Sequence, residues 1–155
     1  MKRFIAISCR ALIVLCLLAS TPLLAGELLM VRSPLTFPEA QPRLEEAIQA
    51  QGYALSQAER VDIDLVAIGF SHGNYRVVSY GRPEEIKMLS CRYPELMPFL
   101  PLQVVIFGER GSSLLVAINP LYLQQFFSQP ELTKLFNRWN YDLERILENV
   151  RDVAR

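Results

Sequence analysis

Two apolar segments joined by turn residues constrain the fold of this chain more than any other feature. Residues 102–107, apart from Gln103, and residues 114–118 are apolar, and they flank residues 108–113, which are glycine, serine and charged residues. Apolar runs separated by such a stretch predict a β-hairpin. The second run is apolar on both faces, which predicts a strand in the interior of a sheet.

The C-terminal part of the chain has the pattern of a long amphipathic helix. Its apolar residues recur every three or four positions, and they are Leu132, Leu135, Phe136, Trp139, Leu143, Ile146, Leu147 and Val150. This spacing places them on one helical face. We expect a helix over residues 131–151 that packs on the sheet. On its other face Arg138 and Arg145 alternate with Asp142 and Glu144, which predicts local ion pairs on a solvent-exposed surface.

Residues typical of helix ends predict two further helices, and a third, short helix is expected after the hairpin. Thr36 and Glu39 have the spacing of a capping box, and the helical pattern that follows ends at Gly52. Pro83 opens a second helix with two glutamates, Glu84 and Glu85, in its first turn, where carboxylates favour the positive end of the helix dipole. We expect both glutamates to lie on a solvated face or to act as partners of the helix dipole. A short helix through Tyr122 and Phe126 follows the hairpin.

Three more segments are predicted to be strands. Residues 28–31 form a short apolar run that fits a buried strand. Residues 53–61 mix alternation with polar residues and fit a further strand. Residues 75–80 are rich in β-branched and aromatic residues and give a clearer signal.

The first 25 residues have the pattern of a secretory signal peptide. Lys2, Arg3 and Arg10 precede an apolar run over residues 11–19, and small residues follow it. A positive start, a short apolar middle and a small-residue end are typical of such a leader. We expect residues 1–25 to be a signal peptide and the protein to be periplasmic or secreted. The alternative is a membrane-anchored protein whose N-terminal segment stays uncleaved.

Removal of the leader leaves a chain of single-domain size with a small acidic excess. The leader takes three of the 16 Lys and Arg residues and none of the 16 Asp and Glu residues, which leaves 13 basic against 16 acidic side chains. This balance gives no global basic field for nucleic acid. Of the three cysteines only Cys91 stays, so an internal disulfide is excluded. We expect residues 26–155 to form one compact α/β (α+β) domain, with a mixed or antiparallel sheet and helices packed mainly on one face.

The order of these elements resembles the family called domain of unknown function 302. The resemblance lies in the capped helix with Gly52-Tyr53, the strand that ends at Gly81-Arg82-Pro83, and the hairpin between Leu100-Pro101-Leu102 and Asn119-Pro120. It covers roughly residues 27 to 125, with the last helix as an extension. The resemblance implies a compact α/β fold, often paired into dimers, with no established activity.

Two residues are candidates for chemistry, each with a plainer alternative. His72 is the only histidine and lies in a glycine-flanked loop, where it would act as a general base with Ser71 or Asp62 nearby. The alternative is an ordinary polar loop residue. Cys91 points away from the apolar face of its predicted helix and near Lys87, as a reactive thiol would. The alternative is a cysteine that packs as a small hydrophobe.

The remaining candidates belong to a ligand pocket. Aromatic residues are numerous enough to line an apolar cavity, and they are Tyr75, Tyr80, Tyr93, Phe99, Tyr122, Phe126 and Phe127. We take His72, Tyr75, Tyr80, Arg82 and Cys91 as candidate ligand-binding residues. No set of catalytic residues and no closed metal site is predicted, since one histidine and one cysteine supply too few ligands. No cofactor is expected.

These observations favour an exported, non-catalytic module that binds a small apolar ligand or another protein. Neither His72 nor Cys91 has a catalytic partner placed by spacing. A homodimer is the expected assembly, and no nucleic-acid partner is expected. The alternative is a small hydrolytic or redox enzyme that uses His72 or Cys91.

Overall fold

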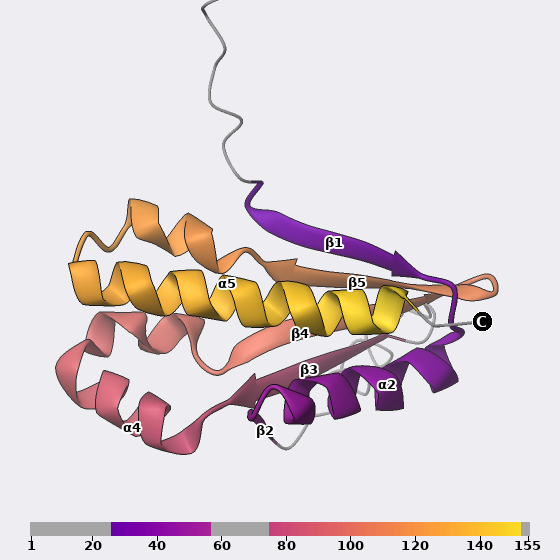
Figure 1. Ribbon diagram of the computed structural model, residues 1–155, viewed down its shortest axis with the longest axis horizontal. Coiled ribbons are helices and arrows are strands. Elements are labelled where there is room, and N and C mark those ends of the chain that lie inside the picture. The colour runs from indigo at the N-terminus through magenta and orange to yellow at the C-terminus, as the bar shows by residue number, and fades with distance from the viewer. Residues whose placement is uncertain (1–25, 57–74, 153–155) are drawn as a thin grey trace, which may run out of the picture.

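The computed structural model describes residues 26–56 and 75–152, and the description below is limited to them (Figure 1). Five strands form one antiparallel sheet in the order β1-β5-β4-β3-β2. The strands are β1 Leu28–Ser33, β2 Ala54–Leu55, β3 Tyr75–Gly81, β4 Leu102–Glu109 and β5 Ser112–Ile118. The helices are α2 Phe37–Ala50, α4 Pro83–Arg92 and α5 Pro130–Arg151, with the 3₁₀ helices η1 Pro94–Phe99 and η2 Pro120–Gln125. The predicted α+β fold with an antiparallel sheet is confirmed.

Helices α2 and α5 lie side by side over one face of the sheet (Figure 1). The core lies between these two layers, because strand residues alternate between faces and one set points at the helices. From the sheet this set includes Val78, Val104, Ile106 and Leu115, all almost fully buried. The predicted one-sided arrangement of helices is therefore confirmed.

Helix α5 buries the predicted apolar stripe against the sheet. Seven of the eight residues of the stripe are buried, and Leu135 is half-buried and packs against the same core. Three- and four-residue steps turn these side chains to one side of the helix, which explains the match. Helix α2 begins at the predicted capping box, where the Thr36 N–H donates to the Glu39 carboxylate at 3.0 Å.

The predicted hairpin is present, but its turn is tighter than expected. Strands β4 and β5 continue through Glu109 and Ser112, which pair with each other, so only Arg110 and Gly111 connect them. Gly111 has φ +75°, a conformation that glycine adopts without steric cost. β5 pairs with both β1 and β4, which confirms its predicted interior position.

Two strand predictions need correction. Residues 28–31 belong to an edge strand, not a buried one, because among the described residues β1 pairs only with β5 and leaves Met30 60% exposed. In the predicted strand over residues 53–61, only Ala54–Leu55 pairs, as strand β2, within the described part of the chain. Asp62 and His72 lie outside the described residues. In residues 26–56 and 75–152, no helix is long and apolar enough to cross a membrane.

Candidate functional site

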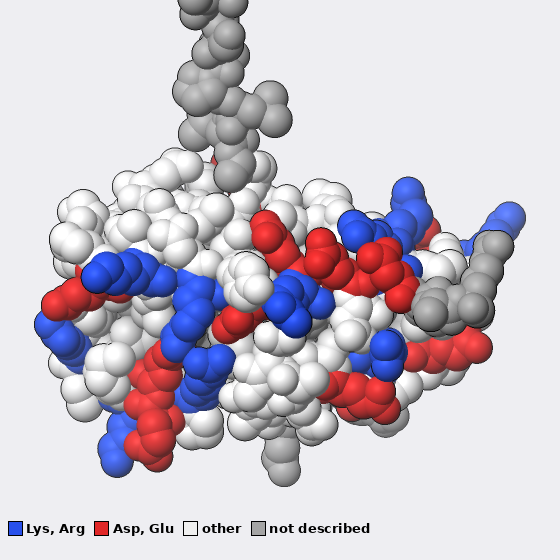
Figure 2. Space-filling view, in the orientation of Figure 1, with Lys and Arg blue, Asp and Glu red and all other residues white. Residues whose placement is uncertain are grey.

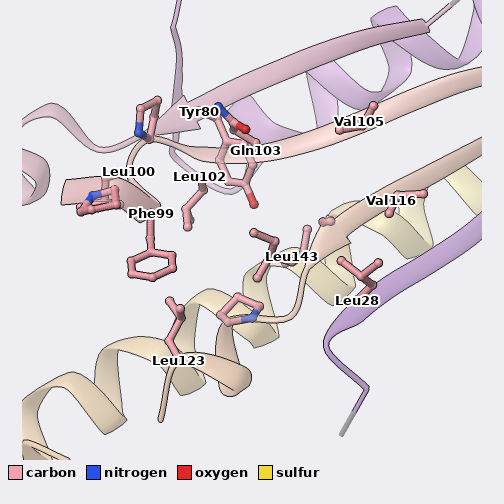
Figure 3. A pocket seen from close by; sticks show the side chains of 15 residues that line it. Leu28, Tyr80, Phe99, Leu100, Leu102, Gln103, Val105, Val116, Leu123 and Leu143 are labelled. Carbon is pink, nitrogen blue, oxygen red and sulfur yellow. The ribbon is translucent and has the colours of Figure 1, made fainter. Parts of the chain in front are cut away.

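A cavity lies where β4 and β5 separate. Their register ends at the pair Val104–Ala117. Beyond this point β4 stays with β3, through the pair Tyr80–Leu102. β5 instead stays with β1, through the pair Leu28–Ile118. The two central strands therefore diverge, and we call the cavity between them the fork pocket (Figure 3).

The fork pocket is apolar and built from every layer of the fold. Its volume is about 250 Å³. Leu102 and Val105 line it from β4, Leu143 lines it from α5, and Leu123 lines it from η2 (Figure 3). The whole lining is Leu28, Tyr80, Pro98, Phe99, Leu100, Pro101, Leu102, Gln103, Val105, Val116, Ala117, Ile118, Pro120, Leu123 and Leu143. All of these residues are uncharged, so the pocket is suited to an apolar molecule.

A polar cluster packs against Tyr80, one of the residues that line the pocket. The Tyr53 ring meets the Tyr80 ring edge-on, with centroids 5.2 Å apart. The Tyr53 hydroxyl donates to Asp142 Oδ2 at 2.7 Å. The Arg82 guanidinium lies 3.5 Å from the same carboxylate oxygen and 4.5 Å from the Tyr53 ring centroid. Since Asp142 precedes the lining residue Leu143, this cluster fixes both Tyr80 and the middle of α5 at the pocket.

Burial raises the pKa of both phenols in this cluster. The pKa of Tyr53 is raised well above its usual value by burial, and then by its hydrogen bond to the Asp142 carboxylate. The pKa of Tyr80 is also raised by burial, with a smaller contribution from the charge of Asp142. Both phenols are therefore neutral at physiological pH, and Tyr53 acts as a hydrogen-bond donor.

A second polar contact joins α4 to α5. Glu85 accepts a hydrogen bond from the Trp139 indole N–H at 2.9 Å and pairs with Arg138. The alternative of a solvated face is therefore wrong for Glu85, and the expectation that the charges of α5 pair locally is wrong for Arg138. Asp142 is only 9% exposed, so it also departs from the predicted solvent-exposed face. Elsewhere basic and acidic side chains alternate over the helix-covered side (Figure 2).

Of the four predicted ligand-binding residues that the structure describes, it brings two together. Tyr80 lines the fork pocket, and Arg82 joins it through the Tyr53–Asp142 cluster. The Tyr75 side chain lies on the face of the sheet opposite to that of Tyr80. It is stacked on Phe107 and does not line the pocket. Cys91 is exposed on α4, so the expectation that it packs as a small hydrophobe is wrong. His72 lies outside the described residues.

Most of the pocket lining is missed by sequence reasoning. Of the seven aromatic residues considered for a cavity, only Tyr80 and Phe99 line this one. Aliphatic residues make up most of the rest, and such residues have no sequence signal that separates a pocket from a core. The Pro98 and Pro101 pair was the available hint, since proline interrupts regular structure at the mouth of the fork.

The described residues do not assemble a recognisable reaction centre. In residues 26–56 and 75–152, no group of three or more His, Cys, Asp or Glu residues is placed to hold a metal ion. The buried carboxylate of Asp142 is engaged by Tyr53 and Arg82. The described residues thus form an apolar cavity beside the polar cluster of Tyr53, Arg82 and Asp142.

The fold and the pocket define a small α+β domain with an antiparallel sheet covered on one face. Residues 29–150 match the family model described as domain of unknown function DUF302, and the chain belongs to this family. The match continues beyond residue 125 and includes α5. A similar solved structure is an uncharacterized conserved protein DUF302 from Bacillus stearothermophilus, at 20% identity and a TM-score of 0.71. The alignment covers 82% of this chain and 100% of that chain. No curated protein matches this chain.

Proposed function

We propose that this protein is an exported, non-catalytic module that binds a small apolar ligand in the fork pocket. The observation that carries the proposal is the pocket itself, a cavity with an uncharged and mostly aliphatic lining at the divergence of two central strands. Apolar lining with a few polar groups is the usual character of a ligand site.

The volume of the pocket sets the size of the ligand. A cavity of about 150 Å³ lined by apolar side chains holds benzene, and drug-sized pockets begin near roughly 300 Å³. The fork pocket, at about 250 Å³, falls between these two values. A ligand somewhat larger than benzene is therefore expected.

The placement of the reactive side chains supports binding rather than catalysis. Cys91 is exposed on α4 and does not line the pocket. Burial raises the pKa values of Tyr53 and Tyr80 further above physiological pH, so both phenols stay protonated. The enzyme alternative uses His72 or Cys91, and its test is a change of each residue to alanine with ligand binding and activity as the readouts.

Binding of two small probes to the purified protein tests the proposal. Cyclohexane and hexan-1-ol are titrated while methyl resonances of Leu123 and Leu143 are followed by NMR, and both probes are expected to shift them. Ala117→Leu fills part of the pocket and is expected to weaken binding at least about tenfold. Phe107→Ala removes an exposed ring that does not line the pocket, and it serves as the control. Equal binding by the Ala117→Leu protein would contradict the proposal.

Export is supported by the N-terminal pattern of residues 1–25. A cleaved leader leaves a protein that begins near residue 26 in the periplasmic fraction or the medium. Intact-mass analysis of the protein isolated from each cell fraction checks this. Recovery of the whole chain from the membrane fraction would favour the uncleaved anchor instead.

We also propose that the module forms a homodimer through strand β1. Asn119 N–H donates to the Glu27 carbonyl, so the backbone groups of alternate residues, including Met30, face away from β5 at the open edge. Antiparallel pairing of this edge with the same edge of a second copy satisfies those groups and obeys two-fold symmetry. It also brings together the side chains of Leu28 and Met30, which are 45% and 60% exposed.

Matched methionine variants test the dimer. Sedimentation of the wild-type protein at micromolar concentration is expected to give the mass of two chains. Met30→Lys places a charge at the edge and is expected to give single chains. Met88→Lys changes a similarly exposed methionine on α4 and should leave the dimer intact. A wild-type mass of one chain would rule the dimer out.

A further inference from the structure

Tyr80 supplies the fork pocket with a buried polar group. Only two of the lining residues, Tyr80 and Gln103, have polar side chains. Gln103 is exposed, whereas Tyr80 is only 2% exposed and its ring meets the Tyr53 ring edge-on. Figure 3 shows the Tyr80 hydroxyl pointing into the pocket. A buried hydroxyl therefore faces a cavity that is lined mainly by apolar side chains.

The Tyr80 hydroxyl makes no side-chain hydrogen bond with another described residue. The buried Asp142 carboxylate instead accepts from the Tyr53 hydroxyl at 2.7 Å and lies 3.5 Å from the Arg82 guanidinium. A buried tyrosine hydroxyl usually has a hydrogen-bond partner. Within the described part of the chain, the Tyr80 hydroxyl is thus left for a molecule in the pocket.

This hydroxyl acts toward a ligand as a hydrogen-bond donor. Burial raises the pKa of Tyr80, and the charge of Asp142 raises it further, so the phenol holds its proton. A neutral phenol has one O–H to donate. The ligand that satisfies it carries an acceptor oxygen.

We infer that the ligand of the fork pocket is an uncharged carbonyl compound with an aliphatic or cyclic body. This inference rests on the proposed ligand-binding function and specifies the chemical class of the ligand. The carbonyl oxygen accepts a hydrogen bond from the Tyr80 hydroxyl. The apolar body fills the space that Leu102, Leu123 and Leu143 line.

Other groups fit this site less well. A carboxylate also accepts from Tyr80, but it brings a negative charge close to the Asp142 carboxylate, whose charge already acts on Tyr80. It also places that charge in a pocket whose lining residues are all uncharged, which is costly without a counter-ion. An alcohol accepts from Tyr80, but its own O–H then needs an acceptor, whereas a carbonyl has no donor to satisfy. A hydrocarbon leaves the Tyr80 hydroxyl without a partner.

Two nearly isosteric probes and two tyrosine variants test this hydrogen bond in the purified protein. Cyclohexanone and methylenecyclohexane have nearly the same shape, but only cyclohexanone has an acceptor oxygen. Tyr80→Phe removes the hydroxyl and keeps the ring. It is expected to weaken cyclohexanone binding about three- to tenfold and not to weaken methylenecyclohexane binding. Tyr141→Phe removes an exposed hydroxyl outside the pocket and serves as the matched control, with both affinities unchanged.

The infrared carbonyl stretch of bound, ¹³C-labelled cyclohexanone reports the hydrogen bond directly. A carbonyl group that accepts a hydrogen bond absorbs at a lower wavenumber than a free one. In the wild-type protein the stretch is expected to lie below its value in cyclohexane solution. In Tyr80→Phe it is expected to move back toward that value. The wild-type measurement does not depend on the folding of any variant.

The outcomes separate this inference from the proposed function. The carbonyl assignment is wrong, and the apolar pocket stands, if bound cyclohexanone absorbs as it does in cyclohexane or if Tyr80→Phe weakens both probes equally. Tighter binding of cyclohexanecarboxylate than of cyclohexanone overturns the assignment in the same way. If neither cyclohexanone nor cyclohexane binds, the proposed function fails and the assignment fails with it. A loss of cyclohexanone affinity alone in Tyr80→Phe, together with the carbonyl shift, supports both.

Discussion

The Tyr53 hydroxyl donates a hydrogen bond of 2.7 Å to Asp142, a residue 89 positions away in the sequence. Tyr53 lies between α2 and β2, and Asp142 lies in the middle of α5. Arg82, the residue before α4, approaches the same carboxylate at 3.5 Å and donates to the Gln51 carbonyl at 3.1 Å. One small cluster therefore ties three separate segments together beside the fork pocket.

Removal of the Tyr53 hydroxyl should destabilise the protein. Tyr53→Phe is expected to lower the free energy of unfolding by about 1–3 kcal/mol, because it leaves a buried carboxylate short of a hydrogen-bond donor. Urea unfolding measures the change. Tyr141→Phe is the matched control, since Tyr141 is 56% exposed, and its effect should stay within about 0.5 kcal/mol. Equal effects of the two changes would show that the contact contributes nothing.

Stability should fall at alkaline pH through the buried phenols. Burial raises the pKa values of Tyr53 and Tyr80 in the folded protein, so the folded state holds protons that the unfolded state loses near pH 10. The stabilisation from these two protonated phenols is complete below pH 10, and it is lost progressively as the pH rises above 10. Each such phenol contributes a slope of up to about 1.4 kcal/mol per pH unit above pH 10.

Urea unfolding at pH 9, 10 and 11 checks this slope. Tyr53→Phe should flatten the dependence, because one of the two phenols no longer titrates. Absorbance at 295 nm should show that these two phenols ionise only when the protein unfolds. A wild-type protein that is equally stable at pH 9 and 11 would contradict the pKa directions.

The contact between Glu85 and Trp139 should stabilise the docking of α4 on α5. Glu85→Ala leaves the Trp139 indole N–H and the Arg138 guanidinium without their carboxylate, and a loss of about 1–3 kcal/mol in unfolding free energy is expected. Trp139 is the single tryptophan, so its fluorescence follows unfolding directly. The neighbouring Glu84 is exposed, and Glu84→Ala should have little effect. A larger effect at Glu84 than at Glu85 would refute the assignment.

The tight hairpin turn should depend on Gly111. Its φ of +75° is a left-handed conformation, so Gly111→Ala is expected to cost about 1–2 kcal/mol of stability. Arg110 precedes it in the turn, and no described residue other than glycine has a positive φ, so Arg110→Ala should be close to neutral. Thermal unfolding of the two variants measures the difference. A tolerated Gly111→Ala would mean that the turn can adopt another conformation.

Local patterns in the sequence are sufficient to predict the framework. The hairpin follows from two apolar runs around turn residues, and α5 follows from a three- and four-residue repeat, because both signals lie within one segment. The capping box of α2 is equally local. Errors occur at the margins, as at the hairpin turn, where Glu109 and Ser112 pair although their residue types also suit a loop.

The sequence by itself therefore determined the antiparallel α+β framework, because the hairpin and the helices α2 and α5 each have a local sequence pattern. Only the tertiary structure decided that Asp142 is buried, because the partners that satisfy its charge, Tyr53 and Arg82, are brought to it from distant segments. The fork pocket was likewise decided by tertiary structure. It exists because β4 follows β3 while β5 follows β1, and that divergence depends on the registers of four strands together.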